Sequence, residues 1–134
     1  PLFFEQGLTL ISQVDEGITV SGDEESLRRV LEILLDNAQK YSSPGGETQV
    51  TLHRRGRNHC ALTVANQGEP IPPEARRQIF QRFYRADPAR SRNGSFGLGL
   101  SIAEGIVAQH HGTIDVTCAG GFNRFRAELP CRQE

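Results

Sequence analysis

One segment of this chain repeats its apolar residues with the period of an α-helix over several turns. Apolar side chains recur three or four positions apart from Leu27 to Tyr41, and this spacing places them on one face of a helix. Asp23 can cap the first turn, where two acidic residues favour the positive end of the helix dipole. A run of Ser, Pro and Gly stops the pattern after Tyr41. The chain must therefore bury one amphipathic helix against a second layer.

Short apolar runs typical of strands supply that layer. They cover residues 8–14, 18–20, 48–53, 60–65, 113–117 and 122–129. A short helix is predicted over 73–83, with Pro73 at its first position. A further helix is predicted over 97–111, and Gly112 ends it. Pairs of strands separated by helices predict an α/β sandwich with the helices on one face of the sheet.

Length, charge and cysteine content exclude several classes of protein. The chain has 134 residues, enough for a single domain, 1–134. Its net charge of −1 argues against nucleic-acid binding, and no apolar run is long enough to cross a membrane. Three cysteines without a CxxC pair indicate reduced thiols in a cytosolic setting and no zinc site. Because methionine is absent even at position 1, we expect the chain to be a piece of a longer protein.

The end of the first helix carries residues suited to a metal and to phosphate. Asn37 lies at the edge of the buried stripe, and Lys40 and Tyr41 share its face. A neutral amide oxygen suits Mg²⁺, and an ammonium group suits phosphate oxygens. Lys40 is the only lysine of the chain. The alternative is an ordinary surface Asn and Lys on an amphipathic helix.

The segment 66–71 follows an apolar strand directly. A polar side chain at a strand end, here Asn66, can hold the base of a ligand above a pocket. Gly68 permits a close approach of backbone. The alternative is an ordinary turn.

Two glycines, Gly97 and Gly99, open the last predicted helix. The free backbone N–H groups and the dipole of a helix start make a phosphate site. No strand immediately precedes these glycines and no Gly-Lys-Ser/Thr follows them, so they form neither a dinucleotide fingerprint nor a Walker loop. Taken alone, the pair is a weak signal.

Aromatic and basic residues alternate over 79–85, ahead of an arginine-rich segment, 84–96, that has no apolar periodicity. The alternative to a functional role is a helix with Phe residues in the core and Arg residues in solvent.

The order and spacing of these motifs make the set specific, although each motif alone is not. They read Leu-Leu-Asp-Asn-Ala-x-Lys-Tyr-Ser, Asn-x-Gly-x-x-Ile-Pro, Ile-Phe-x-Arg-Phe-Tyr-Arg and Gly-Leu-Gly-Leu-Ser-Ile. The set resembles the N, G1, F and G2 boxes of the catalytic ATP-binding domain of bacterial sensor histidine kinases, from about Pro1 to Pro130. The resemblance implies an α+β two-layer sandwich of the Bergerat type, shared with gyrase-type ATPases. In that fold a mixed sheet of about five strands is packed under three helices.

The resemblance also assigns roles by position. Asn37 is the implied Mg²⁺ ligand, and Arg85 is a cation for the terminal phosphate of ATP. Together with Lys40 they form the implied catalytic set, and 84–96 is the implied ATP lid. The implied nucleotide-binding residues are Asn37, Lys40, Tyr41, Asn66, Gly68, Ile71, Phe80, Arg85, Gly97, Leu98, Gly99 and Leu100.

The sequence departs from the family pattern at several positions. Ile33 stands where a second Asn is usual, or a Glu in gyrase-type ATPases, so no base that activates water is evident. Asn66 replaces the usual adenine-binding Asp but keeps an acceptor oxygen. The segment 68–70 lacks a second glycine, and Ser95-Phe96 replaces Gly-Thr. We interpret these as the features of a variant kinase.

The implied activity is transfer of the ATP γ-phosphate to a histidine outside this chain. The four histidines present lack the context of a phosphate acceptor, so an upstream dimerisation and histidine-phosphotransfer helical domain is the expected partner. A response regulator is an indirect partner, and the full protein is expected to be a homodimer. We expect a cytoplasmic domain of a membrane-anchored bacterial receptor, without membrane contact of its own. Two alternatives remain, a degenerate nucleotide-binding sensor and a serine kinase of the anti-sigma type.

Overall fold

The computed structural model describes residues 9–14, 20, 22–81 and 99–131. Its elements, in chain order, are β1 (Thr9–Val14), α2 (Glu24–Tyr41), β2 (Glu47–Arg55), β3 (His59–Gln67), α3 (Ala75–Gln78), α4 (Gly99–Gln109), β4 (Thr113–Ala119) and β5 (Phe122–Pro130). The predicted strand 18–20 falls largely outside the described residues, as does the predicted lid, 84–96, together with Arg85, Gly97 and Leu98.

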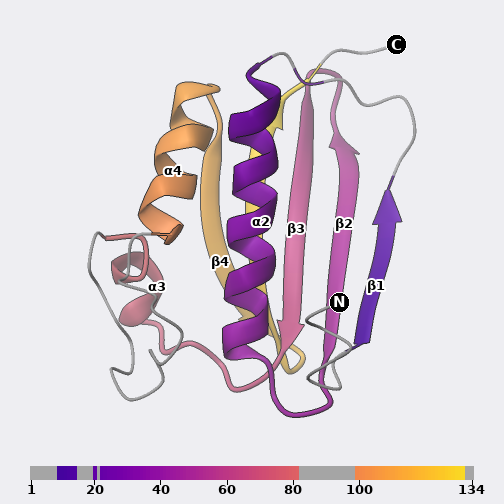
Figure 1. Cartoon of the computed structure of the whole chain (residues 1–134), viewed down its shortest axis with the longest axis vertical. Coiled ribbons are helices and arrows are strands. Elements are labelled where there is room, and N and C mark those ends of the chain that lie inside the picture. Colours follow the sequence, from indigo (N-terminus) through magenta and orange to yellow (C-terminus); the bar gives the residue numbers. More distant parts are fainter. Residues whose placement is uncertain (1–8, 15–19, 21, 82–98, 132–134) are drawn as a thin grey trace.

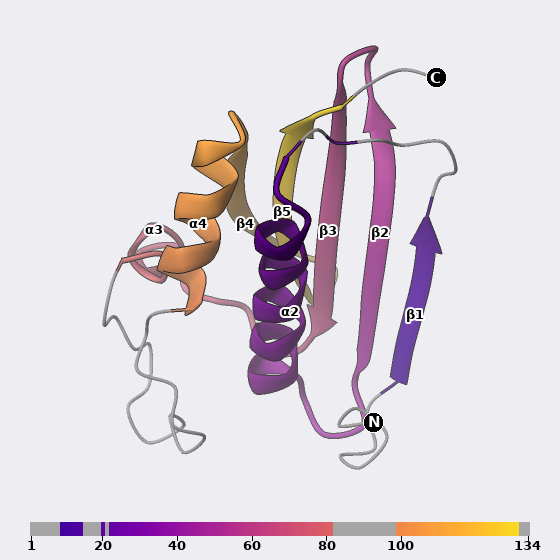
Figure 2. The ribbon, with the colours of Figure 1, turned by 45° about the horizontal axis from the view of Figure 1, so that its top comes forward.

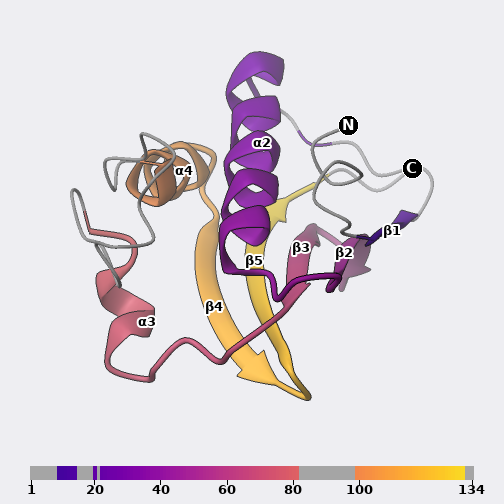
Figure 3. The same ribbon diagram turned by 60° about the horizontal axis from the view of Figure 1, so that its bottom comes forward.

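The strands form one five-stranded sheet in the order β1-β2-β3-β5-β4. β1 runs parallel to β2, and the other neighbours are antiparallel, so the sheet is mixed, as expected. Figures 1 and 2 show α2 and α4 side by side on one face of the sheet. The segment from β3 to α3 crosses the ends of β5 and β4, so that α3 lies beside the β4 edge (Figure 3). The predicted two-layer sandwich is therefore confirmed.

Helix α2 begins where the sequence predicts. The carboxylate of Asp23 accepts hydrogen bonds from the backbone N–H and the hydroxyl of Ser26. The Ser26 hydroxyl bond is the main reason that the pKa of Asp23 is lowered, because hydrogen bonds of this kind favour the charged carboxylate. At the other end, the Ser42 hydroxyl donates to the carbonyl of Ala38 at 2.7 Å. The buried side of the helix carries Val30, Leu34, Asn37 and Ala38.

The core lies between this helix face and alternate residues of the strands. On β5, every second residue from Asn123 to Leu129 is buried, the pattern of a strand with one face toward a core. Strand register sets Phe125 opposite Val64 of β3. The ring of Phe80 packs edge-on against Phe125, with centroids 6.4 Å apart.

The end of α4 has a left-handed residue that the sequence analysis did not identify. His111 has φ 63°, and its N–H donates to the Ala108 carbonyl, while the Gly112 N–H donates to that of Val107. This is the Schellman pattern of helix ends. Gly112 is needed for another reason, since a Cβ there would overlap the carbonyl oxygen of Glu128.

Helix α3 is shorter than the predicted 73–83. It covers Ala75–Gln78, and the residues that follow it to Phe80 form a turn. The Arg76 Nε–H donates to the Ile71 carbonyl at 3.2 Å, which anchors the start of α3 to the preceding loop.

Among the helices that the structure describes, none combines the length and the apolar character needed to cross a membrane.

Candidate functional site

Polar side chains gather at one end of the sheet, beneath the helices. Thr48 of β2 lies opposite Asn66 of β3, and Asn66 lies opposite Asn123 of β5. Asn66 and Asn123 are each two residues from a core residue, Val64 and Phe125, so they share its helix-facing side. Thr48, Asn66 and Asn123 are all 0% exposed. A row of buried polar groups inside an apolar layer needs partners, because an unpaired buried polar group costs about 1–3 kcal/mol.

Asn123 has all of its partners within the protein. Its Oδ1 accepts from the Ile71 backbone N–H at 3.1 Å and from the Cys118 thiol at 2.9 Å. Its Nδ2 donates to the Glu69 carbonyl at 2.9 Å. Asn123 therefore fixes the loop after β3, and with it Ile71, which is buried. The sequence analysis missed this residue, although a polar side chain in the core-facing register of β5 was a visible signal.

The neighbouring side chains lack partners. Within the described part of the chain, the buried side-chain atoms without a hydrogen bond are Asn37 Nδ2, Thr48 Oγ1, Asn66 Nδ2 and Asn66 Oδ1. All belong to the last turns of α2 or to the adjoining ends of β2 and β3. Buried groups of this kind require water or a ligand for compensation.

Close backbone contacts hold the end of α2 against the end of β3. The Ser43 N–H donates to the Gln67 carbonyl at 3.0 Å. A Cβ on Gly68 would overlap the Tyr41 carbonyl oxygen and would lie 3.2 Å from Asn66 Nδ2. The absence of a side chain at Gly68 therefore lets α2 approach β3. This approach brings the Asn66 amide next to the helix end that carries Lys40 and Tyr41, both half-buried.

The start of α4 faces α2. A Cβ on Gly99 would lie 3.5 Å from Cγ2 of Ile33, and Leu100 is buried in the core. Ile33 itself is half-buried and packs against the core. The predicted site residues that the structure describes thus lie at the end of α2, in and after the end of β3, and at the start of α4, with Phe80 beside them in the core.

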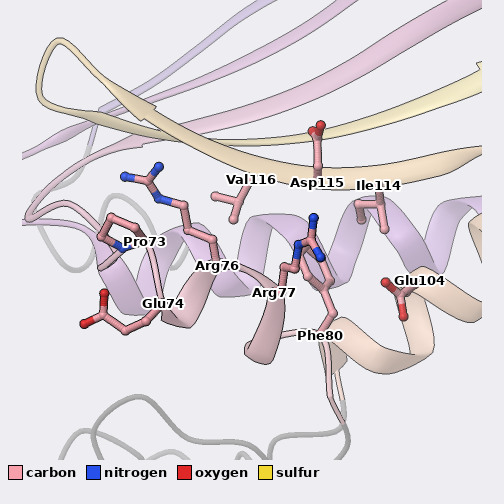
Figure 4. Close-up of a pocket in the computed structure, with 9 residues that line it drawn as sticks. All are labelled: Pro73, Glu74, Arg76, Arg77, Phe80, Glu104, Ile114, Asp115 and Val116. Carbon is pink, nitrogen blue, oxygen red and sulfur yellow. The ribbon is translucent and has the colours of Figure 1, made fainter.

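A separate groove lies outside this region, between α3, α4 and the edge strand β4. It is lined by Pro73, Glu74, Arg76, Arg77, Phe80, Glu104, Ile114, Asp115 and Val116. Figure 4 shows the Arg77 side chain between Asp115 and Glu104. Of the predicted nucleotide-binding residues that the structure describes, the groove shares only Phe80.

The side chains at the end of the sheet fit a nucleotide. A buried amide with an unpartnered acceptor and an unpartnered donor can hydrogen-bond the edge of a purine base. A helix end with an Asn and a Lys can contribute one metal ligand and one cation to a phosphate chain.

Comparison with known proteins gives the family of this chain. The family model "Histidine kinase-, DNA gyrase B-, and HSP90-like ATPase" matches residues 22–133. The histidine-protein kinase/phosphatase MprB of Mycolicibacterium smegmatis is 49% identical over 107 residues, covering 78% of this chain and 22% of that protein. The solved mycobacterial sensor histidine kinase MprB has a TM-score of 0.85 and 30% identity over 99% of this chain and 89% of that one. Full-length ShkA in complex with AMPPNP has a TM-score of 0.84 and 27% identity over 98% of this chain and 27% of that one.

The fold is thus that of a histidine kinase catalytic domain. The chain belongs to the family of histidine kinase-, DNA gyrase B- and HSP90-like ATPases, and within it to the catalytic ATP-binding domains of sensor histidine kinases. It spans about a fifth of the length of the curated relatives that it matches.

Proposed function

We propose that this domain binds ATP together with Mg²⁺ and transfers the γ-phosphate to a histidine of a separate helical domain. The observation that carries the proposal is Asn66, a fully buried amide whose two polar atoms both lack a partner at the end of β3. A base edge that enters this site would supply the missing hydrogen bonds.

Each predicted residue then has a defined task. Asn66 binds the base edge. Asn37 offers its side-chain oxygen to Mg²⁺, which when bound neutralises phosphate charge. Lys40 adds a second positive charge, as Arg85 does in the family pattern, with Tyr41 beside it. The remaining nucleotide-binding residues implied by the resemblance are Gly68, Ile71, Phe80, Gly97, Leu98, Gly99 and Leu100. Catalysis is then mostly positioning and charge neutralisation.

Ile33 favours transfer over hydrolysis. It lies beside Gly99 at the start of α4, where a Cβ on Gly99 would stand 3.5 Å from the Cγ2 methyl group of Ile33. An apolar side chain there cannot accept a proton from water. We therefore propose that the group that attacks the γ-phosphate lies outside this chain.

We do not propose any of the chain's own histidines as the acceptor. His110 uses both ring nitrogens: Nδ1 is 2.8 Å from the Ile106 carbonyl oxygen, and Nε2 accepts from the Asp23 N–H at 3.2 Å. His111 is held in the left-handed turn after α4. His53 and His59 are exposed on antiparallel strands of the sheet. We therefore propose an acceptor on an upstream dimerisation domain of a homodimeric protein, with a response regulator as the next recipient. The domain would lie on the cytoplasmic side of a membrane-anchored receptor.

Incubation with γ-labelled ATP and Mg²⁺ tests the proposal. We expect no stable label on the chain alone and acid-labile label on the helical domain of the same protein when that domain is added. Acid-stable label would indicate a serine kinase instead. Binding of ATP without any transfer would indicate a nucleotide sensor, and stable label on this chain alone would overturn the proposal.

A further inference from the structure

We infer that Thr48 is a positioning residue of the nucleotide site, which orients the Asn66 amide through its hydroxyl. The inference rests on the proposed function, because it concerns the base that Asn66 binds. It assigns to the start of β2 a role that the predicted site residues do not include.

The first observation that supports this role is the position of Thr48 relative to Asn66. Thr48 and Asn66 are directly opposite each other in the antiparallel β2–β3 pair, and the Cβ atoms of such pairs lie about 4.5–5.5 Å apart. Both side chains point to the helix layer, because Val50 and Val64, two residues away on each strand, pack in or against the core. A hydroxyl and an amide at this separation can reach each other by rotation about their side-chain bonds.

The second observation is that polar atoms of both side chains lack hydrogen-bond partners. Thr48 and Asn66 are each 0% exposed, and Thr48 Oγ1, Asn66 Oδ1 and Asn66 Nδ2 have no hydrogen bond. The other cross-strand neighbour of Asn66 is Asn123, whose oxygen and nitrogen are both engaged by the loop after β3. Thr48 is therefore the cross-strand neighbour with a polar atom left for Asn66.

The chemistry of the pair allows it to bind either purine. A threonine hydroxyl can donate or accept, and an Asn amide can turn over. When the hydroxyl accepts from Nδ2, Oδ1 remains free to accept from the amino group of adenine. When the hydroxyl donates to Oδ1, Nδ2 remains free to donate to the carbonyl of guanine. Gly68, whose Cβ position is 3.2 Å from Nδ2, leaves space for either orientation.

The site therefore accepts both purines, because the Thr48 hydroxyl can either accept from the Asn66 amide or donate to it. Thr48→Val keeps the shape of the side chain and removes the hydroxyl, so the Asn66 amide loses the partner that holds it in the orientation that a base requires. We expect the Kd for ATP and for GTP to rise by roughly three- to ten-fold each, the range that a single neutral hydrogen bond supports. Thr48→Ser should restore both values.

The matched control is Thr51→Val. Thr51 lies on the same strand but three residues on, so its side chain is on the opposite face of the sheet, and it is half-buried. The measurements are calorimetric Kd values for Mg-ATP and Mg-GTP in each variant, alone and combined with Asn66→Ala. Thr48→Val should change nothing further once Asn66→Ala has removed the amide.

A second measurement separates this inference from the proposed function. The side-chain NH₂ resonances of Asn66, observed by NMR without nucleotide, should shift in Thr48→Val and remain in place in Thr51→Val. If the protein bound neither nucleotide, the proposed function would fail while these resonances still tested the pair. Unshifted resonances, or nucleotide Kd values equal to those of the unmodified protein, would overturn the inference, and the buried atoms would then be partnered by water alone.

Discussion

Ile33 Cγ2 lies 3.5 Å from the point where a Cβ on Gly99 would stand, an ordinary van der Waals separation. Packing between α2 and α4 therefore leaves room for a methyl group at the first residue of α4. Gly99 is also not among the glycines with positive φ. Among the described residues, neither packing nor backbone conformation requires glycine here, and we propose that the approach of a ligand to the helix start accounts for it.

Gly99→Ala should therefore weaken ATP binding without lowering the stability of the domain. We expect the free energy of unfolding to stay the same or to rise by up to about 1 kcal/mol, because Ala favours helix over Gly. The Kd for ATP should rise by about ten-fold or more, because the methyl group stands where phosphate approaches the N–H groups. Urea unfolding and calorimetry measure the two quantities.

Gly105→Ala is the matched control for this prediction. Gly105 is exposed in α4, and a Cβ there would meet no atom of the described residues within 4 Å. It should gain a similar stability with unchanged ATP affinity. If Gly99→Ala bound ATP with the affinity of the unmodified protein, the start of α4 would not be part of the phosphate site.

Asn37→Ala tests the implied metal ligand. Asn37 is 7% exposed and its Nδ2 has no partner, so its removal should cost at most about 1 kcal/mol of stability. Transfer of phosphate to the helical domain should nevertheless be lost, because the metal that offsets phosphate charge loses a ligand. The exposed neighbour Asp36 provides the control, since Asp36→Ala should transfer normally. Equal transfer rates in the two variants would make Asn37 an ordinary helix residue.

His111→Gly should stabilise the domain. His111 is exposed and has φ 63°, a conformation that glycine adopts without the steric penalty of a Cβ. We expect a gain of about 0.5–1 kcal/mol in thermal or urea unfolding. His110→Ala should do the opposite, because the His110 ring joins α4 to the start of α2 through the Asp23 N–H. A loss of stability in His111→Gly would contradict the strain argument.

The sequence predicted the elements better than their contacts. The Asp23 cap and the helix to Tyr41 depend on neighbouring residues, so local patterns were sufficient to find them. Asn123 escaped prediction because its partners Glu69 and Ile71 are 54 and 52 residues away and meet it only through the sheet register. Thr48 was not predicted for the same reason. The prediction of Asn66 depended on its place at a strand end, and the structure adds that it is fully buried.

The last prediction concerns alkaline pH. Burial, and secondarily the neighbouring Cys131 thiol, raises the pKa of Cys60 to about 11 from 9.0. Between these values the folded protein keeps the Cys60 proton while the unfolded chain loses it, so the folded state binds more protons. Stability must then fall as pH rises from about 9 to about 11, by up to about 1.4 kcal/mol per pH unit for one group. Urea unfolding at pH 8 to 10.5, compared between the unmodified protein and Cys60→Ala, measures this slope directly. Cys60→Ala should start from a lower stability, because it removes a buried sulfur, but should decline less steeply. Identical slopes in the two proteins would show that Cys60 ionises as easily in the folded state as in the unfolded chain.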